Sequence, residues 1–237
     1  MTLAWIAPGD PLPPPRRALR APNGLLAAGR DLGPERLLEA YRQGIFPWFS
    51  QGQPVLWWSP DPRMVLFLDE FKVSRSFGKT LRRLRADPSW SVSSDTAFVQ
   101  VMRECAAPRP QQDGTWITPD IVAAYSGLHA QGFAHSVEVR HDGELAGGLY
   151  GVAIGRMFYG ESMFTRAPEA SKIALAVLVN ALRHGGFSVI DCQQNTRHLA
   201  SLGAREVDRD RFLEMLSLLT ALPAPDWRSL PMEIPEA

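Results

Sequence analysis

The sequence predicts an α+β protein with a small, loop-rich N-terminal domain over residues 1–62 and a larger C-terminal domain over residues 63–237. Two observations support this prediction. Residues 1–62 are rich in Pro, Gly and Trp and show little periodicity, whereas from Met64 onward apolar residues recur at the spacings of strands and helices. With 237 residues and 45% hydrophobic content, the chain can bury a substantial core.

Proline dominates the start of the N-terminal domain, so residues 11–22 are expected to run extended over a surface. One helix is expected to begin near Pro34, because proline suits the first helical turn, and to end before Gly44. Two aromatic runs follow at residues 45–49 and 57–58. Within the second run, Trp57 and Trp58 are expected to join the two domains.

The C-terminal domain is expected to begin with a strand over residues 64–68, followed by three helices. Each helix starts at a residue type that is common at helix N-caps, and the three span residues 74–85, 95–105 and 118–131. A β-meander comes next, because glycine-containing turns separate three strand-like runs at residues 135–140, 145–154 and 157–164.

An apolar helix over residues 171–184 follows the meander. After it we expect a strand, a short helix, a second strand and a last helix, at residues 188–192, 196–202, 204–207 and from 209, and then an extended Pro-rich tail from Pro223. This order resembles the acetyltransferase (GNAT) fold, whose acyl-coenzyme A members carry a Gly-rich loop before the central helix. Residues 165–170 contain no glycine. Coenzyme A is therefore not expected as the donor, and no cofactor is expected.

Composition excludes several classes of protein. Twenty-five basic and 25 acidic residues give a net charge of zero, so there is no global attraction to nucleic acid. Cys105 and Cys192 are too few for a disulfide framework, and no metal site is expected because the sequence has no Cys-x-x-Cys or His-x-x-x-His spacing. No apolar stretch approaches the ~20 residues of a membrane span. We expect a soluble, cytoplasmic monomer.

Two acids interrupt strand-like apolar runs. Glu161 lies within residues 158–164 and Asp191 within residues 189–193. An unpaired buried carboxylate is costly, so such acids are usually partnered or used in chemistry. Gln193 is two residues beyond Asp191, so their side chains should share one face of the strand. These three residues are therefore predicted to form one polar site on an apolar sheet.

Each acid also has a structural interpretation. Asp191 stands at a strand end, where a carboxylate often caps the next turn. Glu161 is a candidate for an internal salt bridge with Arg156 or Arg166. The strand pattern leaves both alternatives open.

Basic residues recur at three- and four-residue steps along one predicted helix face, which gives a positive stripe on a neutral protein. Such a stripe can bind a polyanion, although a solvated helix face has the same pattern. Its members are Lys72, Arg75, Lys79, Arg82, Arg83 and Arg85.

Seven motifs occur in order between about Pro22 and Ala204: GIFPWF at 44–49, WWSP at 57–60, GTWIT at 114–118, GESMF at 160–164, ASK at 170–172, DCQ at 191–193 and NTRHLASLGA at 195–204. In sequence and order they resemble those of the leucyl/phenylalanyl-tRNA–protein transferase family. The resemblance implies an enzyme that moves leucine or phenylalanine, with methionine as a further donor, from aminoacyl-tRNA to the N-terminal Arg or Lys of a protein. That transfer marks the acceptor for degradation.

The resemblance also implies roles for the polar residues. Gln193 would contact the attacking amine, with Asp191 behind it. A neutral amide is too weak a base to hold a proton, so we expect Gln193 to align the amine and Asp191, or the surroundings of the leaving oxygen, to handle the proton. Glu161 would receive the cationic end of the acceptor.

The donor needs an apolar pocket for its side chain and a flat partner for its terminal adenosine. The expected pocket residues are Met163, Phe164, Leu149 and Tyr150, which could equally be ordinary core residues. Stacking on an aromatic ring is worth ~1–3 kcal/mol, and the expected partners are Trp48 and Trp116, with Tyr41, Phe46 and Tyr125 as neighbours.

Two other functions remain open on the sequence. One is a GNAT-fold aminoacyltransferase with another donor, and the other is a non-catalytic module that binds tRNA or protein N-termini. A module that only binds tRNA needs no buried carboxylates, so the acids favour an enzyme.

Overall fold

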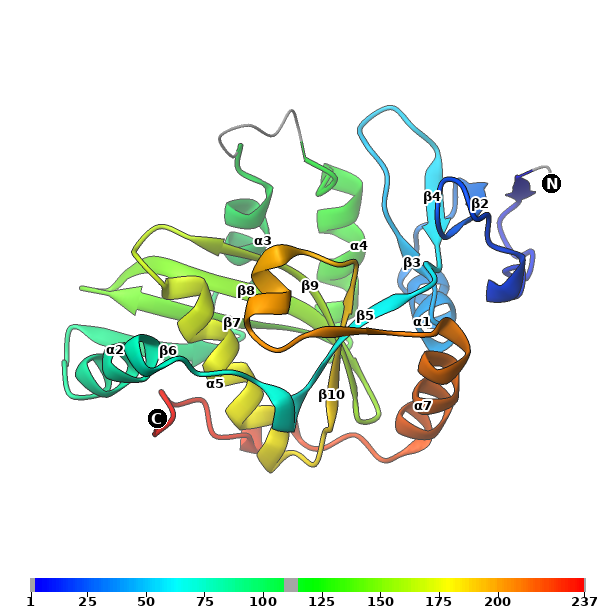
Figure 1. Ribbon diagram of the computed structural model, residues 1–237. Coiled ribbons are helices and arrows are strands. Elements are labelled where there is room, and N and C mark those ends of the chain that lie inside the picture. The colour runs from blue at the N-terminus through cyan, green and yellow to red at the C-terminus, as the bar shows by residue number, and fades with distance from the viewer. Residues whose placement is uncertain (1–2, 109–114, 237) are drawn as a thin grey trace.

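The computed structural model describes residues 3–108 and 115–236. Within these residues the chain builds two sheets, and Figure 1 shows the smaller one at the right beside α1 and α7. The smaller sheet has the strand order β1–β2–β4–β3, with β1 at Ala4–Ile6, β2 at Leu25–Gly29, β4 at Val55–Trp58 and β3 at Phe46–Pro47. This sheet corrects the expectation of a domain made of loops and one helix. Its strands have two to five residues, too few for a clear period of two.

Helix α1, Pro34–Arg42, begins with proline as expected, and α7, Arg209–Ala221, packs beside it. Gly44 follows α1 with a φ of 71°, in the left-handed region that favours glycine. A Cβ atom at Gly44 would lie 2.6 Å from Leu213 of α7. The glycine therefore permits the close approach of α7 to the chain that leads into β3.

The larger sheet, in the described part of the chain, has seven strands in the order β11–β5–β10–β9–β8–β7–β6. The predicted meander forms β7, β8 and β9, and β10 lies parallel to β9. Strand β6 was not expected. The bounds are Arg63–Phe67 for β5, Trp90–Ser94 for β6, Ala134–His141 for β7, Glu144–Ile154 for β8, Met157–Thr165 for β9, Val189–Gln193 for β10 and Arg205–Val207 for β11.

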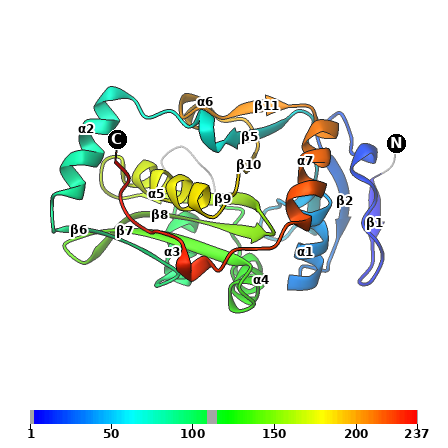
Figure 2. The same ribbon diagram turned by 90° about the horizontal axis from the view of Figure 1, so that it is seen from below.

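Helices cover both faces of the larger sheet. Figure 2 shows α5, Ala170–His184, on one face and α3, Phe98–Ala106, with α4, Pro119–Ala130, on the other. After α5 come β10, the short helix α6 at Arg197–Ser201, and β11, so the succession after the meander is the GNAT-like one that the sequence predicts. The chain is thus an α+β protein with a separate small sheet. The division at residue 62 stays a prediction.

Two local expectations need correction. Asp95 does not cap α3, which begins at Phe98; instead Asp95 adopts a φ of 59° and its carboxylate accepts the backbone N–H of Ser136 at 2.8 Å. The C-terminal tail is not merely extended, because Trp227, Leu230 and Ile234 are buried against the main body. Trp227 stacks on His135 with ring centroids 3.9 Å apart.

The sheet order brings the two acidic strands together. Asp191 in β10 lies opposite Tyr159 in β9, and a β-bulge follows between Asp191 and Gln193. In this register Gln193, the last residue of β10, lies level with Glu161 in the middle of β9. Among the described helices, none has the length and apolar character needed to cross a membrane.

Candidate functional site

The structure brings Glu161 and Gln193 into direct contact. The Gln193 amide Nε2 donates to Glu161 Oε1 at 2.8 Å. Two tyrosine hydroxyls also donate to this carboxylate, Tyr41 of α1 to Oε1 at 2.6 Å and Tyr125 of α4 to Oε2 at 3.1 Å. Glu161 is therefore held by neutral donors from three separate elements.

Burial raises the pKa of Glu161 to about 7, although the hydrogen bonds from Tyr41, Tyr125 and Gln193 lower it in part. A carboxyl group with a pKa near the working pH can both accept and release a proton. The predicted salt bridge is wrong, because Arg166 donates instead to both oxygens of Glu104 at 2.8 and 2.7 Å. Arg156 donates to the Gly185 carbonyl.

Asp191 has a charged partner that the sequence did not suggest. Arg63, at the start of β5, donates from Nε to Asp191 Oδ1 at 2.8 Å and from Nη2 to Oδ2 at 2.6 Å, and both side chains are fully buried. Arg63 also donates to the Gly44 carbonyl at 3.1 Å, and its guanidinium lies 4.7 and 4.6 Å from the ring centres of Phe46 and Phe212. The sequence showed only that an arginine directly precedes the apolar run of residues 64–68.

These contacts change the expected role of Asp191. Its Oδ1 also accepts the backbone N–H of Gln193 at 2.9 Å, so it caps the turn, as the structural interpretation proposed. Protonation would break a buried ion pair and leave Arg63 unpaired, and such losses cost about 3–5 kcal/mol. The expectation that Asp191 handles the proton is therefore disfavoured. Gln193, with a φ of 62°, turns its side chain to Glu161.

A cavity of about 910 Å³ opens beside Glu161 and Gln193. All four residues expected for the donor side chain line it: Met163, Phe164, Leu149 and Tyr150. Sequence reasoning missed further apolar walls from β9, α5, β10 and α6, which had only the signal of ordinary core residues: Phe158, Leu175, Leu178, Ile190 and Leu199.

Tyr150 adds a polar group to this wall. It is fully buried, and among the described residues its hydroxyl has no hydrogen-bond partner. Burial raises the pKa of Tyr150 well above its usual value, so the hydroxyl stays neutral and keeps its proton to donate.

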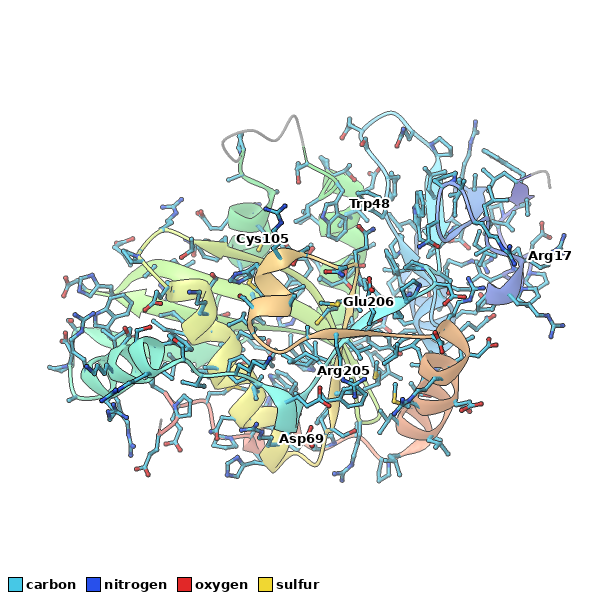
Figure 3. The ribbon with its side chains drawn as sticks, in the orientation of Figure 1. Arg17, Trp48, Asp69, Cys105, Arg205 and Glu206 are labelled. Carbon is cyan, nitrogen blue, oxygen red and sulfur yellow. The ribbon has the colours of Figure 1, made fainter. Side chains whose placement is uncertain are left out.

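The two tryptophans expected to stack on adenosine both line the cavity. Trp48, labelled in Figure 3, is 41% exposed, and Trp58 supports it by donating to its carbonyl at 2.7 Å. Phe46, expected as their neighbour, also lines the cavity, with Arg63 over one face of its ring. Tyr41 and Tyr125 need correction, because both are fully buried against Glu161 and do not line the cavity. Gly114 of the GTWIT motif lies outside the described residues.

The loop after Gln193 is tied to the edge of the sheet. Figure 3 labels Arg205 and Glu206, neighbours on β11, and their partners lie in different segments. Arg205 donates to both oxygens of Glu70 at 2.8 and 3.0 Å, and Glu206 accepts from Asn195 at 3.0 Å. Asn195 is therefore fixed two residues beyond Gln193.

The basic stripe lies on and just before helix α2, Arg75–Arg85, at the left of Figure 1. Ser74 caps α2 by accepting the Phe77 N–H at 3.2 Å. Apolar residues of α2 face the core and the basic ones face outward, and Arg85 pairs with Glu236. The exposed members are Lys72, Arg75, Lys79, Arg82, Arg83 and Arg85.

Known proteins resemble the chain over most of its length. A family model described as leucyl/phenylalanyl-tRNA protein transferase matches residues 65–217, and a model for the N-terminal domain of the same proteins matches residues 30–61. A leucyl/phenylalanyl-tRNA–protein transferase of Bordetella petrii is 58% identical over 97% of this chain and 92% of its own length. One of Cupriavidus pinatubonensis is 60% identical over 94% and 90%.

Solved structures resemble the chain more distantly. FemX is 9% identical with a TM-score of 0.45, covering 77% of this chain and 71% of its own. A GCN5-related N-acetyltransferase from Kribbella flavida is 12% identical with a TM-score of 0.35, covering 71% of this chain and 59% of its own.

Proposed function

Because the chain belongs to the leucyl/phenylalanyl-tRNA–protein transferase family, we propose that it transfers leucine or phenylalanine, with methionine as a third donor, from aminoacyl-tRNA to the N terminus of a protein. The acceptor begins with arginine or lysine, and the added residue marks it for degradation. The observation that supports this best is the contact between Glu161 and Gln193 at an apolar cavity of about 910 Å³.

The reaction is the aminolysis of an ester. The acceptor nitrogen bonds to the ester carbonyl carbon, the bond to the ribose oxygen breaks, and that oxygen gains a proton. Because the reaction is downhill, orientation supplies most of the acceleration and can contribute ~7–11 kcal/mol. Gln193 aligns the amine, the apolar cavity holds the donor side chain, and Trp48 and Trp116 stack on the terminal adenosine.

Charged residues of opposite sign bind the two substrates. Glu161 receives the cationic end of the acceptor through a charge-assisted contact. The exposed basic residues of α2 meet the tRNA body, where each phosphate contact adds a salt-dependent increment to affinity. We propose that the protein acts as a cytoplasmic monomer, in the compartment that holds aminoacyl-tRNA.

The deciding experiment incubates the full chain with Leu-, Phe-, Met- and Val-tRNA and with peptides that begin with Arg, Lys or Ala. Transfer from Leu- and Phe-tRNA to the Arg and Lys peptides is expected. Transfer from Val-tRNA alone would indicate a transferase with another donor. Binding of tRNA without transfer from any donor would indicate a binding module and contradict the proposal.

A further inference from the structure

Three side chains, of which Glu161 lines the cavity and two tyrosines lie buried behind it, form a closed set of oxygen contacts among the described residues. The Tyr41 hydroxyl lies 2.6 Å from Glu161 Oε1, and the Tyr125 hydroxyl lies 3.1 Å from Glu161 Oε2. The two tyrosine hydroxyls are also hydrogen-bonded to each other. A ring therefore runs from one carboxylate oxygen through both hydroxyls to the other carboxylate oxygen.

The number of hydrogens decides what this ring can do. With Glu161 ionised, two hydroxyl hydrogens serve three oxygen–oxygen contacts, so one contact has no hydrogen. With Glu161 protonated on Oε2, each group donates once: Glu161 to Tyr125, Tyr125 to Tyr41, and Tyr41 to Oε1. The geometry thus accommodates one added proton without moving a heavy atom.

Resting on the proposed function, we propose that the ring of Tyr41, Tyr125 and Glu161 takes up the proton that the acceptor's ammonium loses when it becomes the attacking amine. The ammonium gives one proton to Glu161, and the free amine forms the C–N bond. As the ester C–O bond breaks, a second proton moves from nitrogen to the ribose oxygen. Glu161 then returns its proton to solvent, so the net products are an amide, an alcohol and one proton.

The surroundings allow only the carboxyl of this ring to change charge near neutral pH. Burial raises the pKa values of Tyr41, Tyr125 and Tyr150 well above their usual range, so these hydroxyls stay protonated. Asp191 faces the ring from β10 as a second acid, but Arg63 pairs with it. Gln193, also from β10, is neutral and donates to Glu161 in either state.

Tyr41 and Tyr125 are positioning residues in this proposal, because they act through Glu161. Tyr41 is itself held in place, since the Tyr159 hydroxyl donates to its backbone carbonyl at 2.9 Å. Tyr159→Phe keeps the aromatic ring beside Tyr41 and removes a buried hydroxyl that donates to backbone rather than to Glu161, so it controls for the loss of a tyrosine hydroxyl near the ring.

The test measures kcat between about pH 5.5 and pH 9 with saturating Arg peptide and a minimal aminoacyl-adenosine donor. The acceptor's α-amine titrates equally in every variant, so ratios to the wild type remove its contribution. At low pH, kcat should fall as Glu161 becomes protonated, and this fall is the acidic limb of the profile. Tyr125→Phe and Tyr41→Phe should each shift the acidic limb to higher pH by about one unit, because ionised Glu161 loses a charge-assisted hydrogen bond. Glu161→Gln should lower kcat by ~10²-fold or more and abolish that limb.

Tyr159→Phe should leave the acidic limb at its wild-type pH even if kcat falls, because it removes no hydrogen bond to Glu161. If Tyr41→Phe and Tyr125→Phe lower kcat but leave the acidic limb at its wild-type pH, the two tyrosines have only a structural role. If Glu161→Gln keeps the acidic limb, a group other than Glu161 takes the acceptor's proton. If the wild type transfers no residue from any donor, the proposed function fails. The ring is then tested alone by a carboxyl NMR titration of ¹³C-glutamate-labelled wild type and Tyr125→Phe, where equal Glu161 pKa values would overturn it.

Discussion

Glu161 and Asp191 lie on neighbouring strands, β9 and β10, yet their partners are of opposite kinds. Asp191 is gripped at both oxygens by the guanidinium of Arg63. Glu161 receives only neutral donors, two hydroxyls and one amide. The partner, rather than the strand, therefore decides whether an acid is held in an ion pair or is available to exchange a proton.

The two acids also differ in where they lie, and this difference separates a structural role from a chemical one. Arg63 joins Asp191 to the Gly44 carbonyl and to the rings of Phe46 and Phe212, so Asp191 lies where the smaller sheet, α7 and the larger sheet meet. Glu161 instead borders the cavity. We infer that Asp191 has a structural role, because it holds β10 and the backbone of Gln193 in position. Glu161 has the chemical role, because its carboxylate lies at the cavity.

The largest expected effect comes from breaking the Arg63–Asp191 pair. Arg63→Met should lower the free energy of unfolding by about 3–5 kcal/mol, because a buried carboxylate is left unpaired. The double variant Arg63→Met with Asp191→Leu should lose less, since neither charge remains. Urea unfolding with an unchanged m value measures both. A double variant less stable than the single one would contradict the assignment of Asp191 as an ion-pair anchor.

The raised pKa of Glu161 should make the free energy of unfolding depend on pH. Its pKa is about 7 when folded, against about 4.3 for an unfolded glutamate, so between these values the folded state holds the extra proton. Its contribution is fully present below about pH 4.3 and is lost as pH rises through about 7. The loss is at most about 4 kcal/mol, reduced where water reaches the half-buried carboxyl.

The measurement compares the wild type with Glu161→Gln by urea unfolding at about pH 5 and pH 8. The wild type should lose more stability over that interval than the variant. Equal losses would mean that Glu161 is ionised at both pH values, and the contrast with Asp191 would disappear.

For each acid, the sequence could predict that the acid is important but not which residue is its partner. Glu161 and Gln193 stand out because each is a polar residue in an apolar strand. By contrast, Arg63 lies 128 residues from Asp191 in the sequence, and Tyr41 lies 120 residues from Glu161. No local sequence pattern predicts contacts between residues so far apart. For the same reason the capped helix α4 and the meander were predictable, whereas the smaller sheet depends on pairing between distant short strands.

A smaller effect should appear in the choice of acceptor. Glu161→Gln removes the charge that faces the acceptor, so the preference for Arg over Ala, taken as the ratio of the two kcat/KM values, should fall by about 10–100-fold. Asp191→Asn should leave that preference intact. Steady-state kinetics on peptides beginning with Arg, Lys and Ala decide this, and an unchanged preference in Glu161→Gln would place acceptor recognition elsewhere.

The smallest expected effect concerns Tyr150, the tyrosine that faces Glu161 without bonding to it. Its buried hydroxyl has no partner among the described residues, so Tyr150→Phe should raise the free energy of unfolding of the substrate-free protein by about 1 kcal/mol. If the hydroxyl donates to the bound donor, the same change should lower kcat/KM for an aminoacyl-adenosine by about tenfold or less. The acidic limb should not move, unlike in Tyr125→Phe. A shifted limb would place Tyr150 in the proton ring, and a loss of stability would mean that its hydroxyl already has a partner.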